Sequence, residues 1–332
     1  MEYVRQWPLV PLPEVFGLNP NADITKDLGE VNQVLSTVQI TQAQSGGGGS
    51  AKTSDEIITD MSKDILNKLP ANFDIEMAQR RYPVLYTESM NTVVCQELQR
   101  FNKLLSRVRG SLQDLQKAVK GLVVMSADLE GVASAMLINK LPALWEKVSY
   151  PSLKPLSSYT AELLERLNFF QSWVDDGPPL CFAMPYFFFV QAFMTGALQN
   201  YARKYTIPID TVTFDFEFYA MEPTEPPEDG VYTSGLYVEG ARMDTDSMML
   251  AESQPKVLYA QMCVVLLKPC PQDQLSTYEH YNAPIYRTLA RRGVLATTGH
   301  SSNFVMFLRV PTNLPSSHWI CRGVALMCSL SD

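Results

Sequence analysis

The feature that most constrains the fold is an unbroken apolar stripe between residues 94 and 122. Hydrophobic side chains recur there in alternating steps of four and three residues, at Val94, Leu98, Phe101, Leu105, Val108, Leu112, Leu115, Val119 and Leu122. This spacing places all of them on one face of an α-helix. A helix over this stretch would be about 45 Å long at a rise of about 1.5 Å per residue. The stripe therefore predicts one long helix whose apolar face must be covered.

Two arrangements can cover that face. A parallel coiled-coil dimer normally carries charged residues beside the apolar seam, but the flanking positions here are not charged in that manner. Gly110 and Gly121 also interrupt the stretch. We therefore favour an intramolecular helical bundle. The alternative is a stand-alone helical and β interaction adaptor that binds a partner helix through the 94–122 face.

Other segments before residue 206 also have helical patterns. Val31, Val34, Leu35 and Val38 share one helix face, and a Gly-rich linker, natural or engineered, follows at residues 45–53. Thr53 and Glu56 have the spacing of a capping box, which predicts that the next helix begins there. Further helices are predicted over residues 126–139, 158–174 and 191–204.

The pattern changes to strands after Tyr205. Val212, Phe214, Phe216 and Phe218 alternate with polar residues, as in a half-buried strand. Further strands are predicted within residues 231–238, 257–267, 285–288, 304–310 and 320–328. The predicted fold class is α+β, with an N-terminal helical bundle followed by an antiparallel β-barrel-like domain.

Composition excludes several classes of protein. The net charge of −8 argues against nucleic-acid binding, and the six cysteines favour a reducing compartment over a disulfide scaffold. Residues 177–202 contain no Asp, Glu, Lys or Arg, yet Pro178, Pro179 and Pro185 argue against a membrane helix there. We expect no membrane segment and interpret this run as a buried connection between the helices and the strands.

No motif predicts catalysis, a cofactor or a metal. Residues 46–53 resemble a phosphate-binding P-loop, but Ala51 replaces its second Gly and no strand is predicted before it. His300 beside Ser301 has no acidic residue near in sequence, and His318, Cys321 and Cys328 lack the usual spacing of zinc ligands. We therefore predict that the protein is not an enzyme and has no catalytic, nucleotide-binding or metal site.

Charge is distributed unevenly along the sequence. Residues 78–120 carry eight basic and three acidic residues, whereas residues 210–252 carry eleven acidic residues and Arg242 alone. Within the basic segment, Arg100, Lys103, Arg107 and Arg109 form a candidate docking face.

Several longer strings, in order along the sequence, closely resemble the C-terminal region of dynein heavy chains. They lie at residues 15–24, 88–94, 96–105, 149–156, 199–204, 297–305 and 318–326. Residues 195–204 resemble axonemal heavy chains more than the cytoplasmic motor. Residues 149–156 and the Gly-rich insert resemble the single-headed inner-arm type.

The resemblance implies a domain order. Residues 1–44 would end the lid region of the sixth AAA+ module, and residues 45–53 would be the linker. Residues 54–205 would combine small-subdomain helices with the helical half of the C-terminal domain. Residues 206–332 would be its antiparallel β-barrel-like part.

The resemblance also implies a role. The region would brace the AAA+ motor ring and modulate microtubule-based motility in cilia or flagella, while ATP hydrolysis is carried out by modules of the parent heavy chain. Its partners would be the remaining ring modules and linker of the same heavy chain, with no nucleic acid and no membrane. The fragment would be monomeric, and its location cytoskeletal, in the axoneme.

Overall fold

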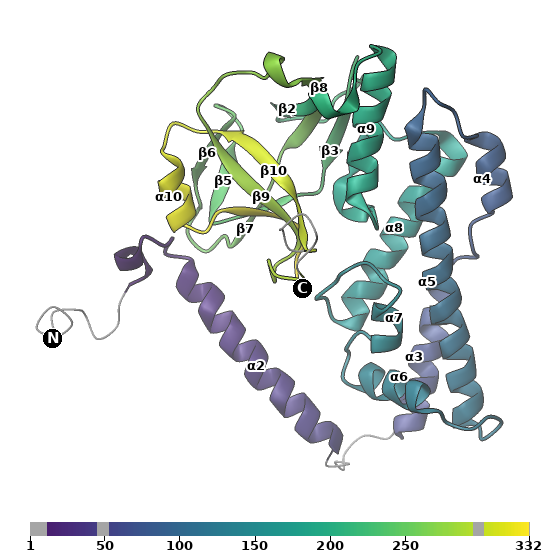
Figure 1. Cartoon of the computed structure of the whole chain (residues 1–332). Helices are drawn as coiled ribbons and strands as arrows, with labels where there is room; N and C mark the ends of the chain where they lie inside the picture. Colours follow the sequence, from purple (N-terminus) through teal and green to yellow (C-terminus); the bar gives the residue numbers. More distant parts are fainter. Residues whose placement is uncertain (1–11, 45–52, 295–301, 332) are drawn as a thin grey trace, which may run out of the picture.

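The structure is a computed structural model that describes residues 12–44, 53–294 and 302–331. Helices predominate in the sequence up to Lys204, where β1 is the one strand described, and strands predominate beyond it (Figure 1). The helices are η1 (Pro13–Phe16), α2 (Ala22–Gln44), α3 (Ser54–Lys68), α4 (Ile75–Arg81), α5 (Ser89–Val119), α6 (Ala127–Leu137), α7 (Ala143–Glu146), α8 (Leu156–Asp176), η2 (Met184–Tyr186), α9 (Val190–Lys204), η3 (Ile209–Thr211), η4 (Gln272–Gln274) and α10 (Ser316–Cys321). The strands are β1 (Cys181–Ala183), β2 (Val212–Tyr219), β3 (Val231–Ser234), β4 (Tyr237–Glu239), β5 (Ala241–Asp244), β6 (Met249–Glu252), β7 (Tyr259–Gln261), β8 (Val264–Pro271), β9 (His280–Thr288), β10 (Phe304–Pro311) and β11 (Ala325–Ser329). The predicted α+β class is confirmed.

The long helix α5 is the spine of the helical half. The stripe residues from Val94 to Leu115 are at most 1% exposed, and α3, α4, α6, α7, α8 and α9 contact this helix. The helix ends at Val119, one turn before the predicted end, because Gly121 adopts a left-handed φ of 72°. Leu122 is therefore 72% exposed. The prediction of an intramolecular bundle is confirmed, and the protein itself covers the face that the adaptor alternative requires.

The strands form three separate sheets in the described part of the molecule. Their strand orders are β1-β3-β8-β2, β10-β9-β11-β4-β7 and β5-β6. Most neighbours are antiparallel, and β2 pairs with β8 along its whole length from Val212 to Tyr219. The prediction of an all-antiparallel arrangement is wrong for β1 with β3 and for β11 with β9, which are parallel. No closed barrel is found among the described strands.

Local turns shape two further parts of the strand half. Gly235, at φ 86°, directs the backbone from β3 in one sheet to β4 in another, so residues 231–238 contribute to two sheets. The predicted strand over residues 320–328 is half wrong, because α10 occupies its first residues. Gly323, at φ 66°, follows α10, and the backbone then enters β11. β10 and β11 lie on opposite edges of β9. This crossing makes β11 parallel to β9.

The uncharged run at residues 177–202 joins the two halves. Its strand β1 pairs with β3, while α9 packs on α5. Phe182, Phe187 and Phe193 are at most 6% exposed and their rings contact one another. The predicted buried connection is confirmed. Among the described residues, no helix is both long and apolar enough to span a membrane.

Helix α3 begins with the predicted capping box. Glu56 N–H donates to the Thr53 hydroxyl at 3.3 Å, and Thr53 N–H donates to the Glu56 carboxylate at 2.8 Å. Thr53 is thus the N-cap of a helix. The rest of the P-loop-like segment, residues 46–52, lies outside the described residues.

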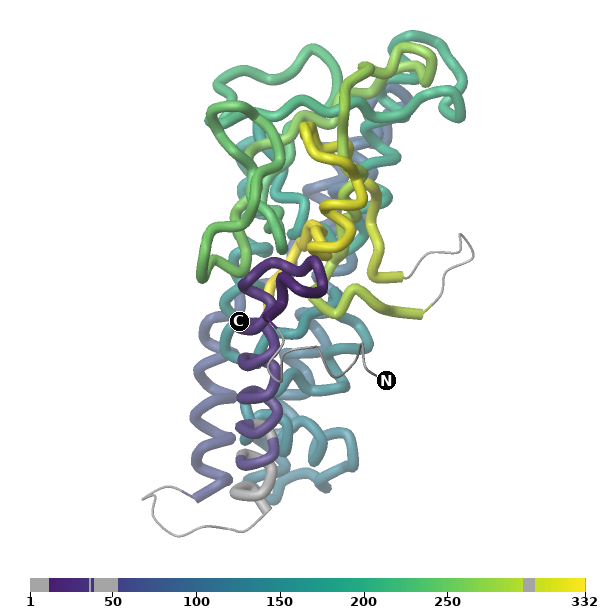
Figure 2. The backbone as a smooth tube through the Cα atoms, turned by 90° about the vertical axis from the view of Figure 1, so that its left-hand side faces the viewer, coloured from purple at the N-terminus to yellow at the C-terminus, as the bar shows by residue number. Residues whose placement is uncertain are grey.

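Helix α2 differs from the other long helices because it does not lie within the bundle. In Figure 1 it extends from the strand half toward the foot of α3, and Figure 2 gives the same course from the side. Every side chain that the structure describes between residues 25 and 38 is exposed. Its start is anchored by Asn21, whose amide donates to the carbonyls of Gln254 and Val257 at 2.8 and 2.9 Å.

Candidate functional site

The four basic residues predicted to form a docking face have two different environments on α5. Arg100 donates to the Glu97 carboxylate at 2.6 Å, and Arg109 donates to Asn72 and the Pro70 carbonyl. These two guanidiniums therefore hold parts of the fold together. Lys103 and Arg107 are exposed and, within the described residues, make no ion pair. Of the four, these two are available for an external partner.

Glu97 is the reason that Arg100 is held in place. Its side chain is fully buried and accepts the backbone N–H groups of Phe188 and Phe189 at 2.6 and 3.2 Å. Burial raises the pKa of the Glu97 carboxyl, and these hydrogen bonds together with Arg100 offset part of that effect. A carboxylate of α5 thus fixes the start of α9, a role that the charge count of the sequence does not reveal.

Lys103 and Arg107 line a groove of about 670 Å³. Its other wall is the loop between α5 and α6, where Val123 and Val124 are 45% and 86% exposed. Asp114, which pairs with Lys117, and Asp128 also line the groove, so its lining carries both signs of charge. The exposed Lys103 and Arg107 beside apolar side chains form the part of this surface that can bind an acidic, partly apolar protein segment. The sequence indicates the cations but not the apolar loop, because the stripe pattern extends the helix to Leu122.

The exposed side of α2 is an apolar face that no described residue is seen to cover. Leu28, Val31, Val34, Leu35 and Val38 are between 44% and 62% exposed. A single exposed Leu or Val is ordinary, but a continuous helical stripe marks an interaction surface. The sequence predicts the helix and its stripe correctly, but it does not indicate that the stripe stays uncovered.

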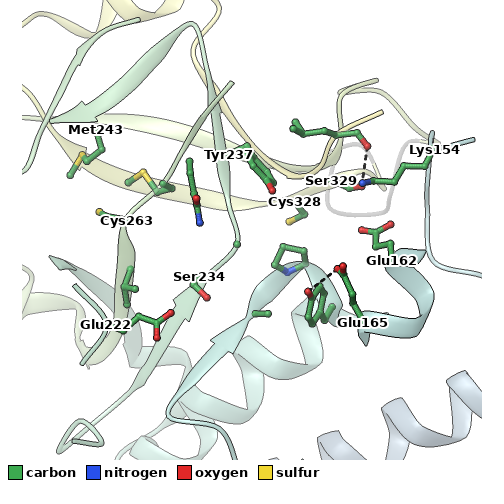
Figure 3. A pocket seen from close by; sticks show the side chains of 18 of the residues that line it. Lys154, Glu162, Glu165, Glu222, Ser234, Tyr237, Met243, Cys263, Cys328 and Ser329 are labelled. Carbon is green, nitrogen blue, oxygen red and sulfur yellow. Dashed lines mark hydrogen bonds between the residues drawn. The ribbon is translucent and has the colours of Figure 1, made fainter. Parts of the chain in front are cut away.

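A cavity of about 900 Å³ lies where α8 meets the strands. Figure 3 shows Glu162 and Glu165 on one wall and Glu222 and Ser234 on the other. Its thiols are poorly suited to nucleophilic chemistry, because burial raises the pKa of Cys263 and raises that of Cys328 to about 12. The carboxylates give the cavity an acidic rim, and sequence reasoning missed it because its walls come from distant segments.

The remaining candidate residues have structural roles or lie outside the described residues. His318 Nε2 lies 2.6 Å from Glu252, which also accepts from Arg322. The structure holds no group of three or more potential metal ligands in residues 12–44, 53–294 and 302–331. His300 and Ser301 lie outside those ranges.

Comparison with known proteins identifies the family. The sequence model for the C-terminal domain of the dynein heavy chain matches residues 28–328. The protein belongs to this family of dynein C-terminal domains. It is 48% identical over 333 residues to dynein axonemal heavy chain 12 of Homo sapiens, covering 100% of the present sequence and 11% of that protein. It is 50% identical over 334 residues to dynein axonemal heavy chain 3 of Mus musculus, covering 100% and 8%. Dynein axonemal heavy chain 1 of Homo sapiens is 48% identical over 333 residues, with 99% and 8% covered.

The sequence therefore spans about a tenth of the length of the curated relatives that it matches. The family match begins at residue 28 and so includes most of α2 as well as the bundle and the sheets. The apolar stripe of α2 from Leu28 onward therefore lies within the residues that the family model matches, and it is exposed. The resemblance inferred from the sequence strings is confirmed at the level of the family.

Proposed function

We propose that this protein is the non-catalytic C-terminal region of an axonemal dynein heavy chain, where it braces the AAA+ motor ring and modulates microtubule-based motility. Family membership supports the proposal, as does the axonemal designation of the relatives. The observation that carries it is the exposed apolar face of α2, because a stripe of this kind needs a partner to cover it. The location that follows is the axoneme of a cilium or flagellum, in an inner arm.

The proposed partners are the remaining ring modules and the linker of the same heavy chain. In this arrangement, residues 1–44 end the sixth AAA+ module's lid region, residues 45–53 link it to the helices of residues 54–205, and residues 206–332 form the strand part. The α2 face would bury its apolar side chains against a neighbouring module. Lys103 and Arg107 would contact an acidic segment through their groove.

The test of the α2 contact uses a full-length heavy chain. The triple variant Val31→Glu, Val34→Glu and Leu35→Glu places three carboxylates on the face, so we expect a weakened ring and a microtubule gliding velocity reduced several-fold. The matched control is Lys26→Gln with Glu30→Gln, which neutralises an exposed ion pair on the same helix. Electron microscopy would report ring integrity. An intact ring with unchanged velocity in the triple variant would contradict the proposal.

The groove beside Lys103 and Arg107 is tested separately with Lys103→Glu and Arg107→Glu in the full-length heavy chain. Arg100 and Arg109 remain unchanged, because their replacement would disturb the fold through Glu97 and Asn72. We expect a velocity change that weakens with increasing salt, as is typical of exposed charges. Unchanged velocity at low salt would exclude the groove as a docking site.

A further inference from the structure

The cavity of Figure 3 combines acidic and apolar walls. Glu162 and Glu165 line it from α8, and Glu222 lines it from the segment that follows β2. The lining also includes the apolar side chains of Met243 and Met262. Its volume of about 900 Å³ lies within the roughly 300–1,000 Å³ that ligand sites in proteins occupy. A cavity of this composition suits an occupant that is both cationic and partly apolar.

Glu162 has an acceptor that no described group uses. Its side chain is 11% exposed. The carboxylate oxygen Oε1 accepts from Arg166 at 2.9 Å. The other oxygen, Oε2, is buried and has no hydrogen-bond partner among the described residues. A buried carboxylate oxygen in this state is destabilising, so the position calls for a further donor.

A second carboxylate lies beside Glu162. Glu165 is three residues further along α8, on the same face of the helix, and it accepts from the Tyr186 hydroxyl at 3.3 Å. Burial raises the pKa of the Tyr186 hydroxyl most, and the charges of Glu165 and Glu162 raise it further. Both carboxylates therefore lie close to this one hydroxyl, which itself lines the cavity.

The charges around the cavity do not balance. Three carboxylates line it, whereas Lys154 is the one basic residue in its described lining and forms no ion pair with them. Arg166 pairs with Glu162 although it does not line the cavity. Three negative and two positive charges leave one negative charge uncompensated. An occupant with a single positive charge would neutralise it.

We propose that this cavity binds an arginine side chain of a protein segment, whose guanidinium donates to Glu162 Oε2 and to the Glu165 carboxylate. A guanidinium carries one positive charge and several N–H donors in one plane, so it can serve two carboxylates at once. A metal ion fits less well, since the described residues contain no group of three or more potential metal ligands. The cavity is larger than one side chain, so the residues that flank the arginine can contact its apolar wall.

The segment's place in the remaining heavy chain rests on the proposed function, whereas the binding of a guanidinium by this cavity does not. A titration with a synthetic peptide therefore tests the site alone. Its failure would leave the proposed function untouched, because that function is tested by ring integrity and velocity.

The probe is the peptide acetyl-Leu-Arg-Leu-amide, and NMR of ¹³C-labelled methionine methyl groups reports where it binds. We expect the signals of Met243 and Met262 to shift, since both line the cavity, and that of the exposed Met77 on α4 to stay in place. The peptide acetyl-Leu-citrulline-Leu-amide has nearly the same shape but no charge. Its affinity should be about tenfold lower, because its hydrogen bonds to the carboxylates are no longer charge-assisted.

Glu165→Gln combined with Glu222→Gln removes two carboxylates from the cavity and leaves the pair of Glu162 with the buried Arg166 intact. Both residues are exposed, so the variant should fold. It should bind the arginine peptide about three- to tenfold more weakly than the wild type.

The matched control is Asp176→Asn combined with Glu225→Gln. It removes the same charge from α8 and from the segment after β2, at exposed positions that do not line the cavity, so its affinity should equal that of the wild type. No shift of the Met243 signal up to about 10 mM arginine peptide would overturn the proposal. Equal affinities for the two peptides, or for the wild type and the Glu165→Gln, Glu222→Gln variant, would do the same.

Discussion

Helices α2 and α5 carry the same kind of apolar stripe but have opposite environments. On α5, Leu98, Phe101 and Leu105 are fully buried, whereas on α2, Val31 and Val34 are 53% and 62% exposed. Periodicity determines that both segments are amphipathic helices, but it does not determine what covers the apolar side. Other helices of this protein cover the apolar stripe of α5. No described residue covers the apolar stripe of α2, which supports a partner elsewhere in the heavy chain.

The largest effect expected from this comparison is that of truncating the centre of α5. Phe101 is fully buried, and its ring contacts those of Phe170 and Phe188 at centroid distances of 5.2 and 4.7 Å. Phe101→Ala should lower the free energy of unfolding by about 3–5 kcal/mol, since it leaves a cavity that the bundle cannot close. Urea unfolding followed by circular dichroism measures the loss. A loss below about 1 kcal/mol would show that α5 is not the centre of the core.

Glu97 tests the polar side of α5 and should have the next largest effect. Glu97→Gln replaces one of the two oxygens that accept from Phe188, Phe189 and Arg100 by an NH₂ donor, at an expected cost of about 1–3 kcal/mol. The cost should depend on pH. Burial raises the pKa of Glu97 in the folded state. Between the ordinary carboxyl pKa and this raised pKa, the folded wild type therefore keeps a proton that the unfolded state has released.

The sign of that dependence follows from proton linkage. The contribution of Glu97 to stability should be greatest at low pH and fall as pH rises from about 4.5 through the folded pKa. The difference in unfolding free energy between wild type and Glu97→Gln should therefore shrink over that range. Urea midpoints measured at several pH values would show it. A difference that grows with pH would mean that the pKa of Glu97 is lowered instead.

The sequence predicted what short-range periodicity encodes and missed what depends on distant segments. Three features could be predicted because each depends on residues that are close in sequence. They are the stripe of α5, the capping box at Thr53 and the alternation in β2. The parallel pairing of β11 with β9 was not, because it depends on a crossing between sheets. Residues around Ile320 are apolar enough for a strand, yet they form α10 with Trp319 buried and Ile320 64% exposed. The acidic cavity leaves no local pattern either, because its walls come from distant segments.

A substitution at Asn21 tests how the start of α2 is attached to the strand half. We expect a smaller loss of stability than for the Phe101 and Glu97 variants. Its side chain accepts from Lys256 N–H at 2.7 Å and donates to the carbonyls of Gln254 and Val257. Asn21→Ala should cost about 1–2 kcal/mol locally, because Asn21 is buried and its partly buried hydrogen bonds to residues 254–257 are lost. Hydrogen exchange should accelerate in the first turns of α2 and remain unchanged in α5. Faster exchange in both helices would contradict their independence.

The smallest effect should come from the apolar face of α2 itself. Val34→Asp should change the free energy of unfolding of this protein by no more than about 0.5 kcal/mol, since Val34 is exposed and the two residues have similar helix propensities. Leu105→Asp, at a buried position of the other stripe, should prevent folding. Urea unfolding of the two variants compares the helices directly. A loss above about 1 kcal/mol in Val34→Asp would show that the protein itself covers α2, and the docking role proposed for this face would then lose its basis.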